Sequence, residues 1–369
     1  MTSPQHLLPP SSTPFEIALS EATDISPRFD GAIWGMHGIK FSPPPSFLPF
    51  LVYEYGLGEL TPYVPNLYDL IDEGVKWTRQ RGTPAALHRA LGWLNYTGEV
   101  EESPIRRTRW NLFQIELGRI RDSEDDLERI EGVADLSTPL RAVFWRGFRG
   151  YDIRALEYGQ SRWGQTLWGA YSGARIRADG AKWSFGRDYS SDHEMTPAEL
   201  TALGVWIEPT EDVEPAWIDI EWPDIEWNSF DADARSELML LGVPVGTAWA
   251  CFRDADNNVI GYRRARVHHR VVQSLTGPYL FGGLRYAQQI SGAEMVLIEA
   301  LTDFGEGNGH TAAQVSFILA GSPADAERPG ALWLGPGELA TSQPEVGAMP
   351  VHIEFGRTVR ERVRILMRF

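Results

Sequence analysis

The sequence contains a single cysteine, Cys251. One cysteine cannot form a disulfide within the chain, so the predicted fold has no disulfide framework. The sequence also lacks any apolar run near the roughly 18–20 residues that a transmembrane helix needs. Its first residues lack the basic start and apolar core of a secretory signal peptide. We therefore expect a soluble protein that folds in a reducing cytoplasm, with no membrane insertion and no export by the general secretory route.

Basic residues are also scarce, because 34 Lys and Arg stand against 50 Asp and Glu and give a net charge of −16. Binding to nucleic acid requires Lys and Arg against the phosphates, so this balance argues against DNA or RNA as the main partner. Hydrophobic content is 43% and charged content 23% of 369 residues. These values are ordinary for a globular protein and provide enough chain for two or three domains.

Signals for catalysis or metal binding are weak. His268 and His269 are adjacent, and neighbours in a strand point to opposite faces, so they are poorly placed to share a metal. The segment 254–259, DADNNV, resembles the start of a calcium loop but has Val259 where that loop needs glycine, and it predicts a turn. The glycine-rich segment 304–309, FGEGNG, predicts a hairpin between strands. We predict no enzyme activity, no cofactor and no metal site.

The N-terminus combines an arm with a helix start. Residues 1–13 predict an extended arm, because Pro9 and Pro10 favour polyproline II geometry. Thr13-Pro14-Phe15-Glu16 then supplies a cap, a proline suited to the first helical position and a capping-box glutamate. One apolar stripe follows at i, i+3, i+4 and i+7, formed by Phe15, Ala18, Leu19 and Ala22. A short helix gains most of its stability from packing, so we expect another chain to cover this stripe, or the helix to fold back on residues 47–94.

The Thr-Pro pair recurs at Thr83-Pro84, Thr138-Pro139 and Thr196-Pro197, and each instance predicts the start of a further helix. The first of these helices would carry Leu87, Ala90, Leu91 and Leu94 on one face. A short helix is predicted over 47–57. Asn66 is predicted to cap another helix that stops at Gly82.

The middle of the chain is rich in tryptophan, with eight of the 14 Trp residues between Trp145 and Trp227. Trp and Arg are enriched where proteins meet proteins, so the cluster favours an interface over the alternative of a filled core. Residues 145–190 predict short strands and turns. Residues 208–237 hold eleven acidic residues and one Arg, and they predict either a strand with one solvent-exposed face or a linker.

From residue 245 onward the pattern is β. Strands are predicted on both sides of the 254–259 turn, on both sides of 304–309, and as two closing strands that tie the C-terminus into a sheet. The basic run 263–270, RRARVHHR, would place Arg264, Arg266 and His268 on one face of a strand and Arg263 on the other. It would meet an acidic partner or form a solvated face.

These patterns predict an α+β multidomain protein, with a short-helix domain first, a mixed middle region and a mostly antiparallel β domain last. The predicted segments are an arm (1–13), a helical domain (14–95), a connector (96–140), a Trp/Arg-rich mixed domain (141–207), an acidic linker-like segment (208–239) and a β domain (240–369).

The opening also carries a family resemblance. LPPSSTPFEIALSEAT resembles the start of the phage tail protein I family, through Leu8, Pro9, Pro10, Ser12, Thr13, Phe15, Glu16, Ala18, Leu19 and Ala22. The family then has a Trp-led turn, a Leu-Pro-aromatic core and an Arg-Gly-Thr helix start, which are similar to Trp34, to residues 45–51 and to residues 81–91. The resemblance covers about residues 7–95. The sequence departs from the family pattern at Gly35-Met36 and at 56–60.

The resemblance implies a structural role in the baseplate of a contractile phage tail. Members of the family resemble the smaller wedge subunit, one copy of which packs with two copies of a larger wedge subunit, and six wedges ring the tail hub. Expected partners are that larger subunit, neighbouring wedges, sheath-initiator and hub proteins, and a tail fibre as a further candidate. The expected location is the virion baseplate, after assembly in the host cytoplasm. The candidate interface residues are Pro9, Pro10, Phe15, Ala18, Leu19, Ala22, Leu87, Leu91, Leu94, Trp145, Arg149, Trp163 and Trp168.

Two rival functions remain at this point. The first is a tail adhesin or fibre-attachment protein that uses residues 240–369 to bind a fibre or a host glycan. The second is a cell-wall glycosidase, since 50 acidic residues always offer carboxylate pairs, although none stands in an unusual setting.

Overall fold

The computed structural model describes residues 8–39, 42–102, 110–120, 124–151, 171–209, 231–244 and 246–369. The chain divides into two compact units, Met1–Arg81 and Gly82–Phe369. The boundary lies inside the segment 14–95 that the sequence predicts as one helical domain. It falls there because α5 (Pro84–Trp93) packs against α6 (Asp125–Ser137) within the second unit.

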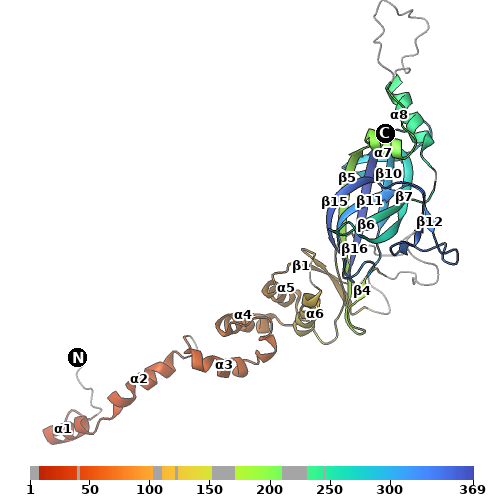
Figure 1. The fold of residues 1–369 in the computed structure, drawn as a ribbon. Coiled ribbons are helices and arrows are strands. Elements are labelled where there is room, and N and C mark those ends of the chain that lie inside the picture. The colour runs from red at the N-terminus through yellow and green to blue at the C-terminus, as the bar shows by residue number, and fades with distance from the viewer. Residues whose placement is uncertain are drawn as a thin grey trace, which may run out of the picture. The chain divides into compact units, whose positions relative to one another are not determined.

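The first unit is helical (Figure 1). Its elements are α1 (Pro14–Ala22), α2 (Ser26–His37), the 3-10 turn Pro45–Phe47, α3 (Leu48–Glu54), the 3-10 turn Gly58–Leu60 and α4 (Leu67–Gln80). The Asn66 side chain accepts a hydrogen bond from the backbone N–H of Tyr68 at 3.1 Å, which confirms the predicted cap of α4. Helices α3 and α4 pack together, and Gly74 lets Leu57 approach because a Cβ there would lie 2.9 Å from Leu57 Cδ1.

After α5, the second unit continues with a β-α-β arrangement. Strand β1 (Gly98–Glu102) pairs antiparallel with β2 (Leu112–Leu117), and β2 pairs parallel with β3 (Val143–Gly150) after the crossover through α6. The sequence predicts a helix start at Thr138-Pro139, and this prediction is wrong. Thr138 ends α6 instead, with its hydroxyl donating to the Ala134 carbonyl at 2.9 Å, and Pro139 cannot continue the helix.

One large sheet runs through the rest of the unit. Its central order is β1-β2-β3-β5-β16-β10-β7-β6-β11-β15, with parallel pairing at β2/β3, β3/β5 and β5/β16 and antiparallel pairing elsewhere. The remaining bounds are β4 (Ala174–Arg175), β5 (Lys182–Glu194), α7 (Pro197–Ala202), α8 (Asp231–Gly242), β6 (Trp249–Arg253), β7 (Val259–Gln273), β8 (Tyr279–Phe281), β9 (Leu284–Gln288), β10 (Met295–Leu301), β11 (Thr311–Ile318), β12 (Ser322–Pro323), β13 (Trp333–Leu334), β14 (Leu339–Ala340), β15 (Val346–Glu354) and β16 (Val359–Arg368).

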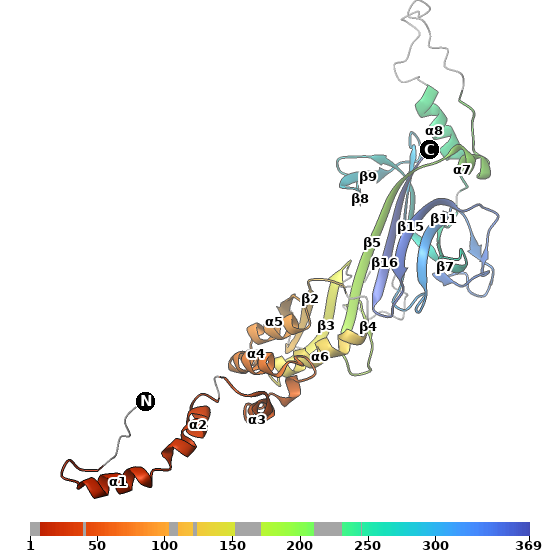
Figure 2. The same cartoon turned by 60° about the vertical axis from the view of Figure 1, so that its left-hand side comes forward.

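The long pairing of β5 with β16 joins regions that are far apart in the sequence. Phe185 to Glu194 lie in register with Val359 to Arg368, and Figure 2 shows the two strands side by side. Arg362 and Arg364 pair with Asp188 across this seam, and Arg368 pairs with Asp192. One sheet therefore spans the segments 141–207 and 240–369, which the sequence predicts as separate domains.

The sheet curls so that its last strand, β15, lies against β5. The link is made by side chains: Tyr189 Oη donates to the His352 carbonyl at 3.0 Å, and Arg187 Nη2 donates to the Glu354 carbonyl at 2.5 Å. The main core fills the inside of the curl, with Phe252, Phe317 and Val363 among its members. A second cluster lies outside, where the β8–β9 hairpin packs over Val271, Leu297 and Leu366, and Figure 2 shows this hairpin to one side of the sheet.

The predicted fold class, α+β with a mostly antiparallel C-terminal region, is confirmed. The turn at 254–259 is also confirmed, because Asp254 accepts hydrogen bonds from the backbone of Asp256 and Asn258 between β6 and β7. The segment 304–309 is a turn but not a hairpin. It joins β10 to β11, which are separated in the sheet by β7 and β6. Phe369 donates its N–H to the Glu294 carbonyl at 3.0 Å, which ties in the C-terminus as expected.

Candidate assembly surfaces

Helix α1 starts as its sequence predicts. The Thr13 hydroxyl accepts from the Glu16 backbone N–H at 3.3 Å, and the Glu16 carboxylate accepts from the Thr13 backbone N–H at 2.7 Å. Pro14 holds the first helical position, where no N–H is needed. The arm before the helix is less extended than predicted, because the Ser12 N–H donates to the Pro9 carbonyl and makes a turn. Residues 1–7 lie outside the described residues.

The predicted apolar stripe of α1 is exposed. Phe15 is 74% exposed and Leu19 is 52% exposed, and Ala18 and Ala22 are exposed as well. Within the described residues, no side chain of α1 is buried. Helices this short are marginal in water without tertiary packing. The stripe therefore has the pattern of a surface that a partner covers.

Helix α2 carries a second apolar stripe, which the sequence analysis above does not predict. Ile25, Phe29, Ile33 and Met36 recur at i, i+4, i+8 and i+11, each with more than half of its surface exposed. Gly31 and Gly35 obscured the pattern, although both lie inside the helix. The sequence signal for this stripe is the helical spacing of its apolar residues, together with Ser26-Pro27 as a helix start. Trp34, expected in a turn, lies inside α2 with its ring edge against His37.

The other predicted interface residues have different surroundings. Pro9 and Pro10 are exposed. Trp145 is half-buried against Tyr171, and Arg149 donates to Glu116 at 3.4 Å. Trp163 and Trp168 lie outside the described residues. The remaining three, on α5 and at its C-cap, are almost fully buried within the second unit and would meet a partner only if α5 left that core: Leu87, Leu91 and Leu94.

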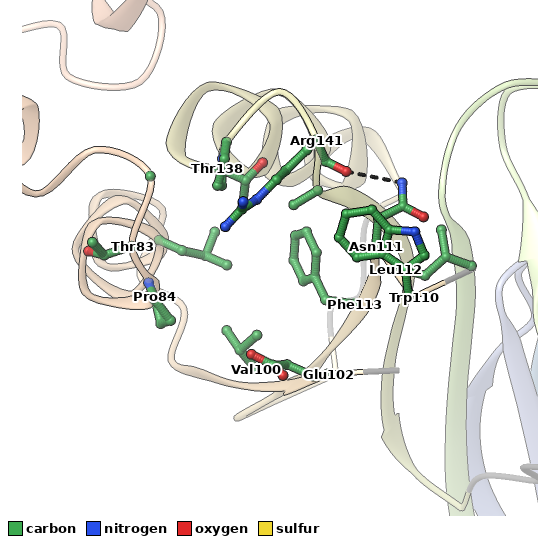
Figure 3. A pocket seen from close by; sticks show the side chains of 14 residues that line it. Thr83, Pro84, Val100, Glu102, Trp110, Asn111, Leu112, Phe113, Thr138 and Arg141 are labelled. Carbon is green, nitrogen blue, oxygen red and sulfur yellow. Dashed lines mark hydrogen bonds between the residues drawn. The ribbon is translucent and has the colours of Figure 1, made fainter. Parts of the chain in front are cut away.

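A pocket of about 320 Å³ opens between β1, the start of α5 and the segment that joins α6 to β3. Figure 3 shows Phe113 at its centre, Val100 and Glu102 on one wall and Arg141 on the opposite wall. Asn111 Nδ2 donates to the Arg141 carbonyl at 3.0 Å, and the Val143 N–H donates to the Asn111 carbonyl at 2.9 Å. These bonds fix the rim, where Trp110 is 64% exposed.

Two groups of the sheet region, Cys251 and Glu306, have raised pKa values. Burial raises the pKa of the Cys251 thiol to about 12, with the charge of Glu345 acting in the same direction, so the thiol is a poor nucleophile. Burial also raises the pKa of Glu306, which is ion-paired with the buried Arg263. The basic run at 263–270 thus meets acidic groups of its own unit, since Arg266 also pairs with Glu299.

In the described ranges, no group of three or more His, Cys, Asp or Glu side chains is arranged to hold a metal ion. No helix in the described part of the chain combines the length and apolarity needed to cross a membrane.

Helices α1 and α2 carry exposed apolar stripes, and α5, β1, β2 and α6 follow later in the chain. The model of the phage tail protein family (Tail_P2_I) matches residues 8–141. The match confirms the predicted resemblance and extends it through α6 to the start of β3. It supports a structural role in a phage tail, alongside other tail proteins. A search of curated proteins finds no match for the chain.

Proposed function

We propose that this chain is the smaller wedge subunit of the baseplate of a contractile phage tail. One copy would assemble with two copies of a larger wedge subunit around the tail hub. The N-terminal arm and helices α1 and α2 would form the joint with that subunit. The proposal combines the family match over residues 8–141 with the exposed apolar stripes of the two helices.

The unburied stripes are the observation that carries the proposal. Four large apolar side chains of these stripes lie exposed to water: Phe15, Leu19, Phe29 and Ile33. Burying each of them would contribute a free energy of roughly 1.5–3 kcal/mol. Assembly recovers this free energy and gives both helices the packing that they need. Protein interfaces use apolar and aromatic anchors of this kind.

The test is co-expression with the larger wedge subunit of the same phage, followed by native mass spectrometry. The intact chain should give a one-to-two heterotrimer, and deletion of residues 1–23 should abolish it. Leu19→Asp and Phe29→Asp should each weaken it, because a charge would be buried without a partner. Gly31→Asp is the matched control, since Gly31 lies on the opposite side of α2 from the stripe and has open space around it. A heterotrimer that tolerates both stripe variants would refute this joint.

A second candidate function is attachment of a tail fibre or a host glycan through the C-terminal β region. The β8–β9 hairpin favours it, because Leu280 and Leu284 on the hairpin and Leu275 just before it are all exposed. Leu280→Lys with Leu284→Lys should then yield virions that assemble a baseplate but lack fibres or fail to adsorb. Normal fibres and normal adsorption would remove this candidate.

A further inference from the structure

We propose that the outer edge of β1 and the pocket beside it bind an extended, basic segment of another tail protein, with a large apolar side chain of that segment in the pocket. That the partner is a tail protein rests on the proposed assembly role. The edge and the pocket are features of the chain itself, so they can be tested without any wedge subunit.

Strand β1 lies at an edge of the sheet that the described residues form. Among the described strands it pairs with β2 alone. The Gly118 N–H donates to the Thr97 carbonyl at 2.7 Å, which shows that Thr97 belongs to the residues whose backbone groups face β2. Because this orientation alternates along an antiparallel pair, the backbone N–H and C=O groups of Glu99 and Glu101 also face β2. The backbone donors and acceptors on the outer side belong to Gly98, Val100 and Glu102, and such a row accepts an added strand.

Charge selects the kind of strand that can be added. Three of the five residues of β1 are glutamates, and Glu99 and Glu102 are exposed. Like charges directly opposite each other destabilise a strand pair, whereas opposite charges stabilise it. The β1 strand of a second copy is therefore a poor partner. A segment with Lys or Arg at alternate positions is a good one.

The pocket adds an apolar requirement. Val100 and Glu102 project into it from β1, Leu87 and Phe113 are apolar lining residues, and Trp110 stands at the rim. A volume of about 320 Å³ accepts one large side chain such as Leu or Phe. Arg141 on the far wall has an exposed side chain that can donate to a carbonyl or carboxylate of the occupant. The occupant thus runs with its basic residues along β1 and its apolar residue over Phe113.

The experiment uses the purified full-length chain and two short fluorescent peptides, one alternating Lys with Val and Leu and the other with Glu in place of Lys. Fluorescence anisotropy should show the Lys peptide binding at least about tenfold more tightly. Glu99→Lys with Glu102→Lys should reverse the preference. The matched control, Glu21→Lys with Asp30→Lys, makes the same change in net charge at exposed positions on α1 and α2 and should leave the preference unchanged.

Val100→Pro separates strand addition from simple charge attraction. It removes an outward N–H but none that faces β2, and proline is tolerated at such edge positions. It should abolish binding of the Lys peptide while the circular dichroism spectrum stays unchanged. Equal binding of both peptides, a control pair that shifts the preference as much as the β1 pair, or full binding by Val100→Pro would each overturn the proposal. None of these results depends on whether the wedge heterotrimer forms.

Discussion

At the scale of single residues, Glu199 shows how one side chain joins three elements. It completes the capping box of α7 with Thr196, accepts from the Gly347 N–H of β15 at 2.9 Å, and contacts His193 Nε2 of β5. Partial burial acts to raise the pKa of Glu199. The hydrogen bonds from the Thr196 and Gly347 backbone, with those from the His193 and Thr196 side chains, outweigh it and lower the pKa to about 2.

This depressed pKa predicts an acid-sensitive contribution to stability. A carboxylate whose folded pKa lies below its unfolded value of about 4.3 stabilises the fold above that pH and loses the contribution as the pH falls towards 2. Glu199→Gln should therefore lower the free energy of unfolding by roughly 2 kcal/mol at pH 7. The difference should shrink below about pH 4 and vanish near pH 2. Chemical denaturation across this pH range measures it, and a difference that stays constant with pH would contradict the assignment.

Residue-scale signals in the sequence were reliable where the partner is local. The capping boxes at Thr13 and Thr196 were predictable because each needs only a glutamate three positions later. The Thr-Pro pair at 138 does not start a helix, because Thr138 is the C-cap of α6 and its hydroxyl donates back to the Ala134 carbonyl. Nothing local in the sequence showed that Glu199 would also reach Gly347.

At the scale of secondary-structure elements, α1 and α5 look alike in sequence but differ in surroundings. Both begin at Thr-Pro and carry an apolar stripe, yet Leu19 on α1 is half-exposed whereas Leu91 on α5 is fully buried. Leu19→Ala should change the free energy of unfolding by no more than about 0.5 kcal/mol. Leu91→Ala should cost about 2–5 kcal/mol, because it leaves a cavity.

Thermal or chemical denaturation of the isolated chain decides this comparison. Equal losses for the two variants would mean that α1 packs on its own chain, as the fold-back alternative requires. The contrast also shows what helical periodicity can predict. It finds the apolar face of a helix, but whether the same chain or another one covers that face depends on contacts distant in sequence, such as the packing of α5 on α6.

At the scale of the whole molecule, the order of the strands was the part least accessible from the sequence. Most strands after residue 245 were predictable from alternation and turn residues. Their partners were not, because β5 pairs with β16 across the chain and β10 does not pair with its successor β11. Such non-local pairing leaves no local pattern, and it is the reason that the predicted boundaries at 140, 207 and 239 do not coincide with breaks in the sheet.

The parallel β5/β16 seam predicts how the chain responds to truncation. A chain that ends at residue 239 would lose β16 and expose the edge of β5 from Phe185 to Glu194, together with Asp188 and Asp192, which would lose their arginine partners. Such a chain should aggregate, or show rapid hydrogen exchange across β5. A chain that starts at Gly82 keeps every pairing of the sheet and should unfold cooperatively. If the 1–239 chain instead protected β5 as well as the intact protein does, the middle region would be a domain of its own, and the C-terminal strands would be an addition to it rather than its completion.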